Sequence, residues 1–155
     1  MADHIEAARC GHGETTNRLQ KLEAAGQAVW LDFIDRRFIA DGGLKKLVEE
    51  DGLTGVTSNP SIFEKAIGHS DAYDDQLNAQ VEAHPGTVEG TYEALAIKDI
   101  QDACDTLRPV YDRLDGRDGF VSMEVSPYLA METAATLAAA KRLWTEVDRP
   151  NLMIK

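Results

Sequence analysis

The chain has 155 residues, the length of one ordinary domain, and its 43% hydrophobic and 28% charged residues are typical of a globular protein with a buried core. The formal net charge of −11 argues against nucleic acid and anionic membranes as partners, because both are recognised through clustered Lys and Arg. No apolar stretch is long enough for a membrane span, and the N-terminus lacks an apolar signal core, so we expect a cytoplasmic protein.

The cysteines and histidines show no pattern that binds a metal. Cys10 and Cys104 lie far apart without metal-type spacing, and we expect two free thiols in a reducing compartment. The histidines form neither a His-x-His nor an HExxH pattern and lie at positions 4, 12, 69 and 84. The sequence therefore predicts no metal site.

The chain begins with a polar segment and then becomes helical. Residues 1–14 are polar and contain glycine, and we expect them to form a flexible N-terminus. Residues 15–26 predict a short helix, with Leu19 and Leu22 facing the core.

Strands and helices then alternate along the chain. Apolar runs at 28–34 and 53–58 have the length of strands, and residues 41–52 between them predict a helix bounded by glycines. Pro60 lies near the first turn of the next helix, where its missing N–H costs little. The remaining elements are helices from about 70 to 115, a strand at 119–125, a helix at 130–147 and a strand at 151–155.

Two residues mark expected boundaries within the helical region. Ser70 can cap the first helix there, while Pro109 should kink the longer helix or end it early. Strands separated by helices imply parallel pairing, because a parallel return needs a long crossover. This order is typical of an α/β protein, either a doubly wound sheet or a (β/α) barrel. No Gly-x-Gly-x-x-Gly loop follows a strand, which disfavours a dinucleotide-binding sheet.

Every predicted strand carries polar residues near its C-terminal end. Successive strand side chains alternate between faces, so polar residues spaced by two share one face. In a barrel these side chains would converge at the C-terminal mouth, where barrel enzymes carry their chemistry. The candidate site residues are Asp32, Thr57, Asn59, Ser122, Glu124 and Lys155.

A simpler role is open for four of these residues. Asp32 could cap a following helix, and Asn59 before Pro60 could form only a turn and a helix cap. Glu124 could pair with a surface lysine, and Lys155 could be solvated. An Asp, a Glu and a Lys at one mouth would nevertheless be costly to bury without a purpose.

Several segments resemble the transaldolase family. "GVTSNPSIF" (55–63) closely resembles the first signature of that family, and "NLMIK" (151–155) resembles the opening of the second, whose lysine forms the Schiff base. "LDFIDR", "DGGLKKL" and "GFVSMEVSPYLAMETAATLAAAKRLW" resemble the corresponding family segments. The long branch of the family, which includes fusions to a glucose-6-phosphate isomerase domain, is the most similar.

The resemblance implies a fold that is larger than this chain. The family is a (β/α)8 TIM barrel of the class I aldolase type, and the chain would supply its first four strands. Residues 15–155 are then expected to form the N-terminal half of the barrel, as a fragment that ends at the Schiff-base lysine.

The resemblance also assigns a role to each candidate residue. Lys155 would attack the carbonyl of a ketose phosphate such as sedoheptulose 7-phosphate, because a neutral lysine amine forms imines with carbonyls. Asp32 would be the general base for C–C cleavage, and Glu124 would relay protons through a water. Asn59 would orient the dihydroxyacetone unit, which is then transferred to an aldose phosphate such as glyceraldehyde 3-phosphate in the pentose phosphate pathway.

The residues that line the pocket are implied in the same way. Thr57 and Ser122 would lie in the pocket wall, and the reaction needs no metal or organic cofactor. Two alternatives stay open: a related Schiff-base aldolase that releases free dihydroxyacetone, and a catalytically inactive half-barrel. For the chain of 155 residues alone, we expect self-association and no turnover, because an open half-barrel exposes strand edges.

Overall fold

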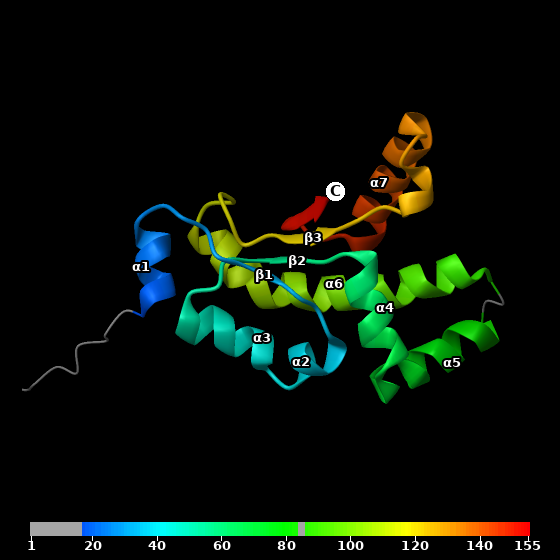
Figure 1. Ribbon diagram of the computed structural model, residues 1–155, viewed down its shortest axis with the longest axis horizontal. Helices are drawn as coiled ribbons and strands as arrows, with labels where there is room; N and C mark the ends of the chain where they lie inside the picture. Colours follow the sequence, from blue (N-terminus) through cyan, green and yellow to red (C-terminus); the bar gives the residue numbers. More distant parts are fainter. Residues whose placement is uncertain (1–16, 84–85) are drawn as a thin grey trace, which may run out of the picture.

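The chain forms a single parallel β-sheet of four strands with helices packed along it (Figure 1). The structure is a computed structural model, and it describes residues 17–83 and 86–155. The strands lie in the order β1-β2-β3-β4, and every neighbouring pair is parallel, which confirms the predicted α/β fold. The strands are β1 Trp30–Asp32, β2 Gly55–Thr57, β3 Val121–Met123 and β4 Leu152–Ile154.

Helices connect the strands, and the strand order matches the first half of a (β/α)8 TIM barrel. The expected N-terminal segment 1–14 lies outside the described residues. Within the described ranges, no helix has both the length and the apolar character needed to cross a membrane. The helices and helical turns are α1 Arg18–Ala24, α2 Arg36–Ala40, α3 Gly43–Lys46, the π-turn η1 Leu47–Asp51, α4 Pro60–Gly68, η2 Asp71–Tyr73, α5 Asp74–Ala83, α6 Val88–Arg113, η3 Pro127–Leu129 and α7 Thr133–Val147.

The sheet has an apolar face and a polar face, as the alternation of side chains predicts. The residues of the apolar face lie side by side in register and pack with the helices in the core; they are Leu31, Val56, Val121 and Leu152. The next residues along the strands form a layer on the opposite face: Asp32, Thr57, Ser122 and Met153. Candidate site residues therefore lie on the face that points away from the core helices.

The prediction that two leucines of α1 face the core was wrong. Leu19 and Leu22 of α1 are 37% and 44% exposed, because α1 lies beside the N-terminal ends of the strands and attaches through polar contacts (Figure 1). Asn17 caps α1 and donates to the Glu50 carbonyl at 2.9 Å. Of the two outcomes expected at Pro109, an early end of α6 does not occur, because the helix continues to Arg113 with Pro109 exposed near its end.

A short helix, α2, was not predicted. Asp35 caps it by accepting a hydrogen bond from the Phe38 N–H at 2.9 Å. Asp32 therefore does not cap this helix, and the simpler role considered for it fails. Five residues are too few to show a helical apolar period, which explains why the sequence pattern missed α2.

A buried ion pair attaches α2 to α6. The Arg36 Nε donates to Asp99 Oδ1 at 2.7 Å, and the Tyr73 hydroxyl donates to Asp99 Oδ2 at 2.7 Å. The guanidinium also lies 4.2 Å from the centre of the Tyr73 ring. Burial raises the pKa of the Asp99 carboxyl, while the hydrogen bonds from Arg36 and Tyr73 act in the opposite direction. This cluster holds the segment that follows β1.

Removing the buried carboxylate should destabilise the protein strongly. Asp99→Ala leaves Arg36 and the Tyr73 hydroxyl without their acceptor, and we expect a loss of about 3–5 kcal/mol in the free energy of unfolding. Asp102→Ala is the matched control, because it breaks an exposed pair with Lys98 on the same helix and should cost less than about 1 kcal/mol. Urea unfolding of both variants measures the difference, and equal losses would contradict the role of Asp99.

Cys104 should be chemically inert in the folded protein. Its side chain is buried, and burial, followed by the charge of Asp105, raises the pKa of the thiol to about 12. Because the thiolate is the reactive form, we expect Ellman's reagent to label Cys104 only on unfolding. Cys10 lies outside the described residues, so the measurement uses Cys10→Ser protein in native buffer and in urea. Rapid labelling in native buffer would contradict the prediction.

Candidate active site

Lys155 contacts two other candidate residues at the C-terminal ends of the strands. Its Nζ lies 2.9 Å from Glu124 Oε1 and donates to Thr57 Oγ1 at 2.9 Å. The side chains of Lys155 and Glu124 are 40% and 34% exposed, so both stay accessible to a ligand. The amine therefore reaches from the end of β4 across β3 to β2.

Thr57 is the central residue of this group. Its Oγ1 accepts hydrogen bonds from Lys155 Nζ and from Ser122 Oγ, each at 2.9 Å. Ser58 faces the other way, is buried, and donates to the Ser122 carbonyl at 2.7 Å. These bonds couple β2 to β3 and fix the direction of the Thr57 side chain.

Asp32 lies next to Thr57 across the β1–β2 pair. The two residues are direct partners in the parallel register, and neighbouring strands lie about 4.8 Å apart. Asp32 is exposed and has no hydrogen-bond partner among residues 17–83 and 86–155. Because the lysine amine reaches Thr57, it lies one strand away from Asp32, and the carboxylate is free to meet a ligand held at the amine.

Asn59 has the capping role that its position before Pro60 suggested. Its Oδ1 accepts a hydrogen bond from the Ile62 N–H at 3.0 Å, and Pro60 occupies the first turn of α4. The amide nitrogen of Asn59 has no partner within the described part of the chain. Capping thus uses the oxygen and leaves the Nδ2 donor for another role.

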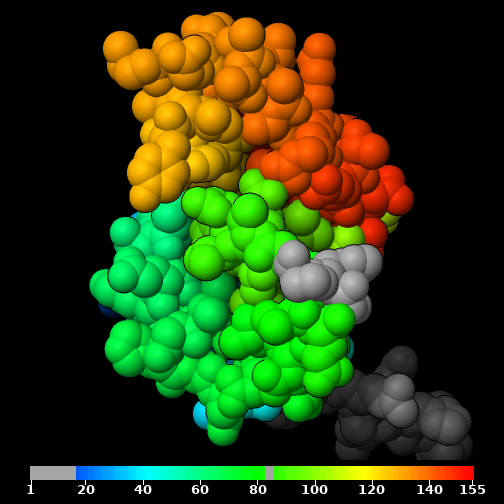
Figure 2. All heavy atoms as spheres, turned by 90° about the vertical axis from the view of Figure 1, so that its right-hand side faces the viewer, coloured from blue at the N-terminus to red at the C-terminus, as the bar shows by residue number. Residues whose placement is uncertain are grey.

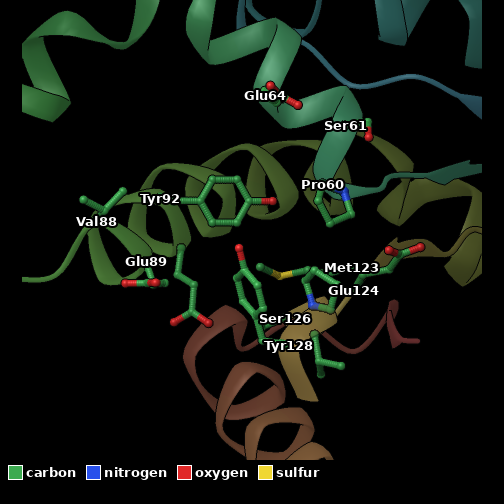
Figure 3. A pocket seen from close by; sticks show the side chains of 13 residues that line it. Pro60, Ser61, Glu64, Val88, Glu89, Tyr92, Met123, Glu124, Ser126 and Tyr128 are labelled. Atoms are coloured by element: carbon green, nitrogen blue, oxygen red, sulfur yellow. The ribbon is translucent and has the colours of Figure 1, made fainter. Parts of the chain in front are cut away.

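A pocket of about 390 Å³ opens beside Glu124, which alone among the candidate site residues lines it. Thr57 and Ser122, which were expected in the pocket wall, do not line it. Figure 2 looks onto this side of the molecule, where the connection between β3 and α7 lies above α4 and the start of α6. Figure 3 shows Tyr92 from α6 and Tyr128 from η3 projecting toward the pocket, and Glu124 also lines it. Burial, followed by the charges of Glu124 and Glu93, raises the pKa of Tyr92 to about 12.

The two tyrosines were not identified from the sequence. Tyr128 comes shortly after Glu124 at the end of β3, and a polar aromatic residue in a loop at a strand end is a detectable signal. Tyr92 lies within a long helix with no local feature that distinguishes it. Only the packing of α6 against the end of β3 brings it to the pocket.

No group of three or more metal-ligating side chains is present within the ranges that the structure describes. The chemistry available is that of an amine between a carboxylate and a hydroxyl, with a second carboxylate one strand away. An amine in this setting can form an imine with a carbonyl compound, and the carboxylates can move protons. A parallel β/α sheet with polar side chains at the C-terminal ends of its strands is the arrangement found in (β/α) barrel enzymes.

The chain belongs to the transaldolase/fructose-6-phosphate aldolase family, whose model matches residues 29–155. It is 49% identical over 139 residues to a transaldolase of Thiobacillus denitrificans, and the match covers 90% of this chain and 38% of that protein. It is 44% identical to a transaldolase of Trichodesmium erythraeum, over 90% of the chain and 37% of the relative. A transaldolase of Thermobifida fusca is 50% identical, over 88% and 37%.

The chain thus spans little more than a third of the length of these relatives, at 37–38%. The match nevertheless includes all four strands and every candidate site residue.

The two roles of Asn59 can be separated by substitution. Asn59→Asp keeps an oxygen that caps α4 but removes the Nδ2 donor, so we expect the free energy of unfolding to change little. Asn59→Ala removes the cap and should lower the free energy of unfolding by about 1 kcal/mol. Urea unfolding checks both values. A loss in Asn59→Asp as large as that in Asn59→Ala would show that the amide nitrogen also supports the fold.

Proposed function

We propose that this chain supplies the Schiff-base lysine and the proton-transfer groups of a transaldolase, which moves a dihydroxyacetone unit from sedoheptulose 7-phosphate to glyceraldehyde 3-phosphate. The observation that carries the proposal is the placement of the Lys155 amine, 2.9 Å from both Glu124 and Thr57 at the strand ends. The transaldolases that are 44–50% identical to the chain support the same reaction.

Lys155 acts as the nucleophile, and Glu124 accepts and returns the protons that imine formation moves. An amine attacks a carbonyl only after it loses a proton, and the Glu124 carboxylate lies at hydrogen-bond distance to accept one. The protonated Glu124 then returns the proton, through a water, to the hydroxyl that leaves as the imine forms. Thr57 accepts a hydrogen bond from the amine on its other side and keeps the amine at the strand ends.

Asp32 and Asn59 act on the bound sugar. Once the imine has formed, Asp32 takes the proton from the C4 hydroxyl, the C3–C4 bond breaks, and the cationic imine accepts the electron pair. The free amide nitrogen of Asn59 donates to the hydroxyls of the dihydroxyacetone unit and orients it. Ser122 donates a hydrogen bond to Thr57 Oγ1 and so fixes the direction of the Thr57 side chain.

The wider setting of the protein follows from this reaction. We propose that residues 15–155 form the N-terminal half of the barrel, that the substrates are sugar phosphates, and that the reaction belongs to the pentose phosphate pathway. The reaction needs no cofactor. A cytoplasmic location fits the free Cys104 thiol, and a fused isomerase domain stays a prediction of the family resemblance.

A second candidate is an aldolase that releases free dihydroxyacetone. The family description joins transaldolase with fructose-6-phosphate aldolase, and both reactions use the same imine. The two differ in whether an acceptor aldehyde is needed. Product analysis with and without glyceraldehyde 3-phosphate separates them, because only the aldolase turns over without the acceptor.

Lys155→Ala should abolish imine formation. The test uses a hybrid in which residues 15–155 replace the matched segment of the Thiobacillus denitrificans relative, incubated with fructose 6-phosphate and borohydride. We expect a covalent adduct in the unmodified hybrid, detected by mass spectrometry, and none in Lys155→Ala. Asp32→Asn should still trap the sugar but cleave it at least about 100-fold more slowly.

The exposed Lys141 on α7 provides the matched control. Lys141→Ala should trap the sugar as well as the unmodified hybrid does. Undiminished trapping in Lys155→Ala would place the nucleophile elsewhere and refute the proposed function.

The polypeptide of 155 residues, produced by itself, should self-associate and lack turnover. β1 and β4 each have one unpaired edge within the described sheet, and Met153 on the polar face is 44% exposed. Size-exclusion chromatography should therefore show dimers or larger species, and a coupled assay should show no transfer of dihydroxyacetone. A stable monomer with ordinary transaldolase rates would contradict both expectations.

A further inference from the structure

Trp30 lies directly below the candidate active site, on the same face of the sheet. It precedes Asp32 by two residues, and its register partner Gly55 precedes Thr57 by two. Residues spaced by two share a face and are about 6.6 Å apart along a strand. The Trp30–Gly55 layer is therefore the next layer beneath Asp32 and Thr57, toward the N-terminal ends of the strands.

Gly55 provides the space that the indole ring occupies. A Cβ atom at position 55 would lie 2.2 Å from Trp30 Cε2 and 2.5 Å from Nε1, far inside van der Waals contact. Gly55 is not among the glycines with a positive φ, so the backbone does not require glycine there. Position 55 requires glycine because any side chain there would occupy the space of the indole. The Trp30 ring extends from β1 over β2.

Asp118 holds the other side of the ring. The Trp30 Nε1 donates to Asp118 Oδ1 at 3.1 Å, and the same oxygen accepts the Gly119 N–H at 2.9 Å. Asp118 belongs to the loop between α6 and β3, at the end of the sheet opposite to the site. The indole is thus positioned by a glycine beneath it and by a carboxylate at its edge.

We propose that Trp30 is the floor of the active site and a positioning residue for the proposed reaction. The ring limits how deeply the carbon chain of the imine enters, and so holds the C4 hydroxyl at the level of Asp32. It also places an apolar surface between the reacting groups and water from the opposite end of the sheet. This inference rests on the proposed function of Lys155 and Asp32.

Fluorescence of the 155-residue chain tests the geometry. Trp30 is the only tryptophan left in Trp144→Phe, because the chain contains two. Adding Gly55→Ala to this background should displace the indole, shift its emission to longer wavelength and increase quenching by acrylamide. Gly68→Ala is the matched control, since a Cβ there meets nothing within 4 Å. Unchanged emission and quenching in Gly55→Ala would overturn the seating of Trp30 on Gly55.

Kinetics of the hybrid test the positioning role. We expect Gly55→Ala to lower kcat by about 100-fold, the effect of a displacement of about 1 Å, while borohydride trapping at Lys155 stays near normal. Trp30→Phe keeps an aromatic floor without the bond to Asp118 and should lose about 10-fold or less. Trp30→Phe should thus retain more activity than Gly55→Ala, in which the ring is displaced.

The outcomes distinguish this inference from the proposed function. Normal kcat in Gly55→Ala, with a displaced indole and trapping intact, would overturn the role of Trp30 and leave the Schiff-base chemistry standing. Failure of the unmodified hybrid to trap the sugar at Lys155 would refute the proposed function itself. Equal losses of melting temperature and of kcat in Gly55→Ala and Gly68→Ala would indicate a general structural effect and would also overturn the positioning role.

Discussion

The hydrogen-bonded register of four parallel strands is the constraint on which the rest of the structure depends. It places Leu31, Val56 and Val121 in one layer against the helices, and Asp32 and Thr57 together in the next layer on the opposite face. A slip of one residue in any strand would exchange these faces, exposing apolar side chains and burying carboxylates. Because this exchange would cost much free energy, the register that forms the core also determines which side chains meet at the site.

The site uses this register without relying on deep burial. Lys155 and Glu124 neutralise each other at 2.9 Å while staying partly exposed, which avoids the large cost of an unpaired buried charge. Thr57 accepts hydrogen bonds from both the Lys155 amine and the Ser122 hydroxyl. Its side chain therefore links β2 to β3 and β4, in addition to the backbone hydrogen bonds of the sheet. A carbonyl compound can therefore displace the contacts of the amine without disturbing the core.

The helices secure the strand that carries Asp32. The ion pair between Arg36 and Asp99 ties the segment after β1 to α6, and Trp30 ties the other end of β1 to the loop before β3 through Asp118. Asp32 lies between these two anchor points. Its side chain is exposed, but its backbone is held on both sides, which suits the role proposed for Asp32.

The sequence alone determined the order of the four strands, their parallel pairing and the set of strand-end residues, because apolar periodicity and residue type are local properties. It also predicted the Asn59 cap and the first turn at Pro60, since a cap depends on only a few neighbouring residues. It failed for Leu19 and Leu22, whose exposure depends on whether another element covers them.

Only the tertiary structure decided which side chains touch. The Lys155 contact with Thr57 joins residues that are 98 positions apart, and the Arg36 contact with Asp99 joins residues 63 apart. No local pattern encodes such pairs, since they depend on strand order, register and the path of α6. The contact between Trp30 and Gly55 is also decided by the tertiary structure. No sequence pattern marks this glycine, and the need for it follows from the Trp30 side chain that the neighbouring strand places over it.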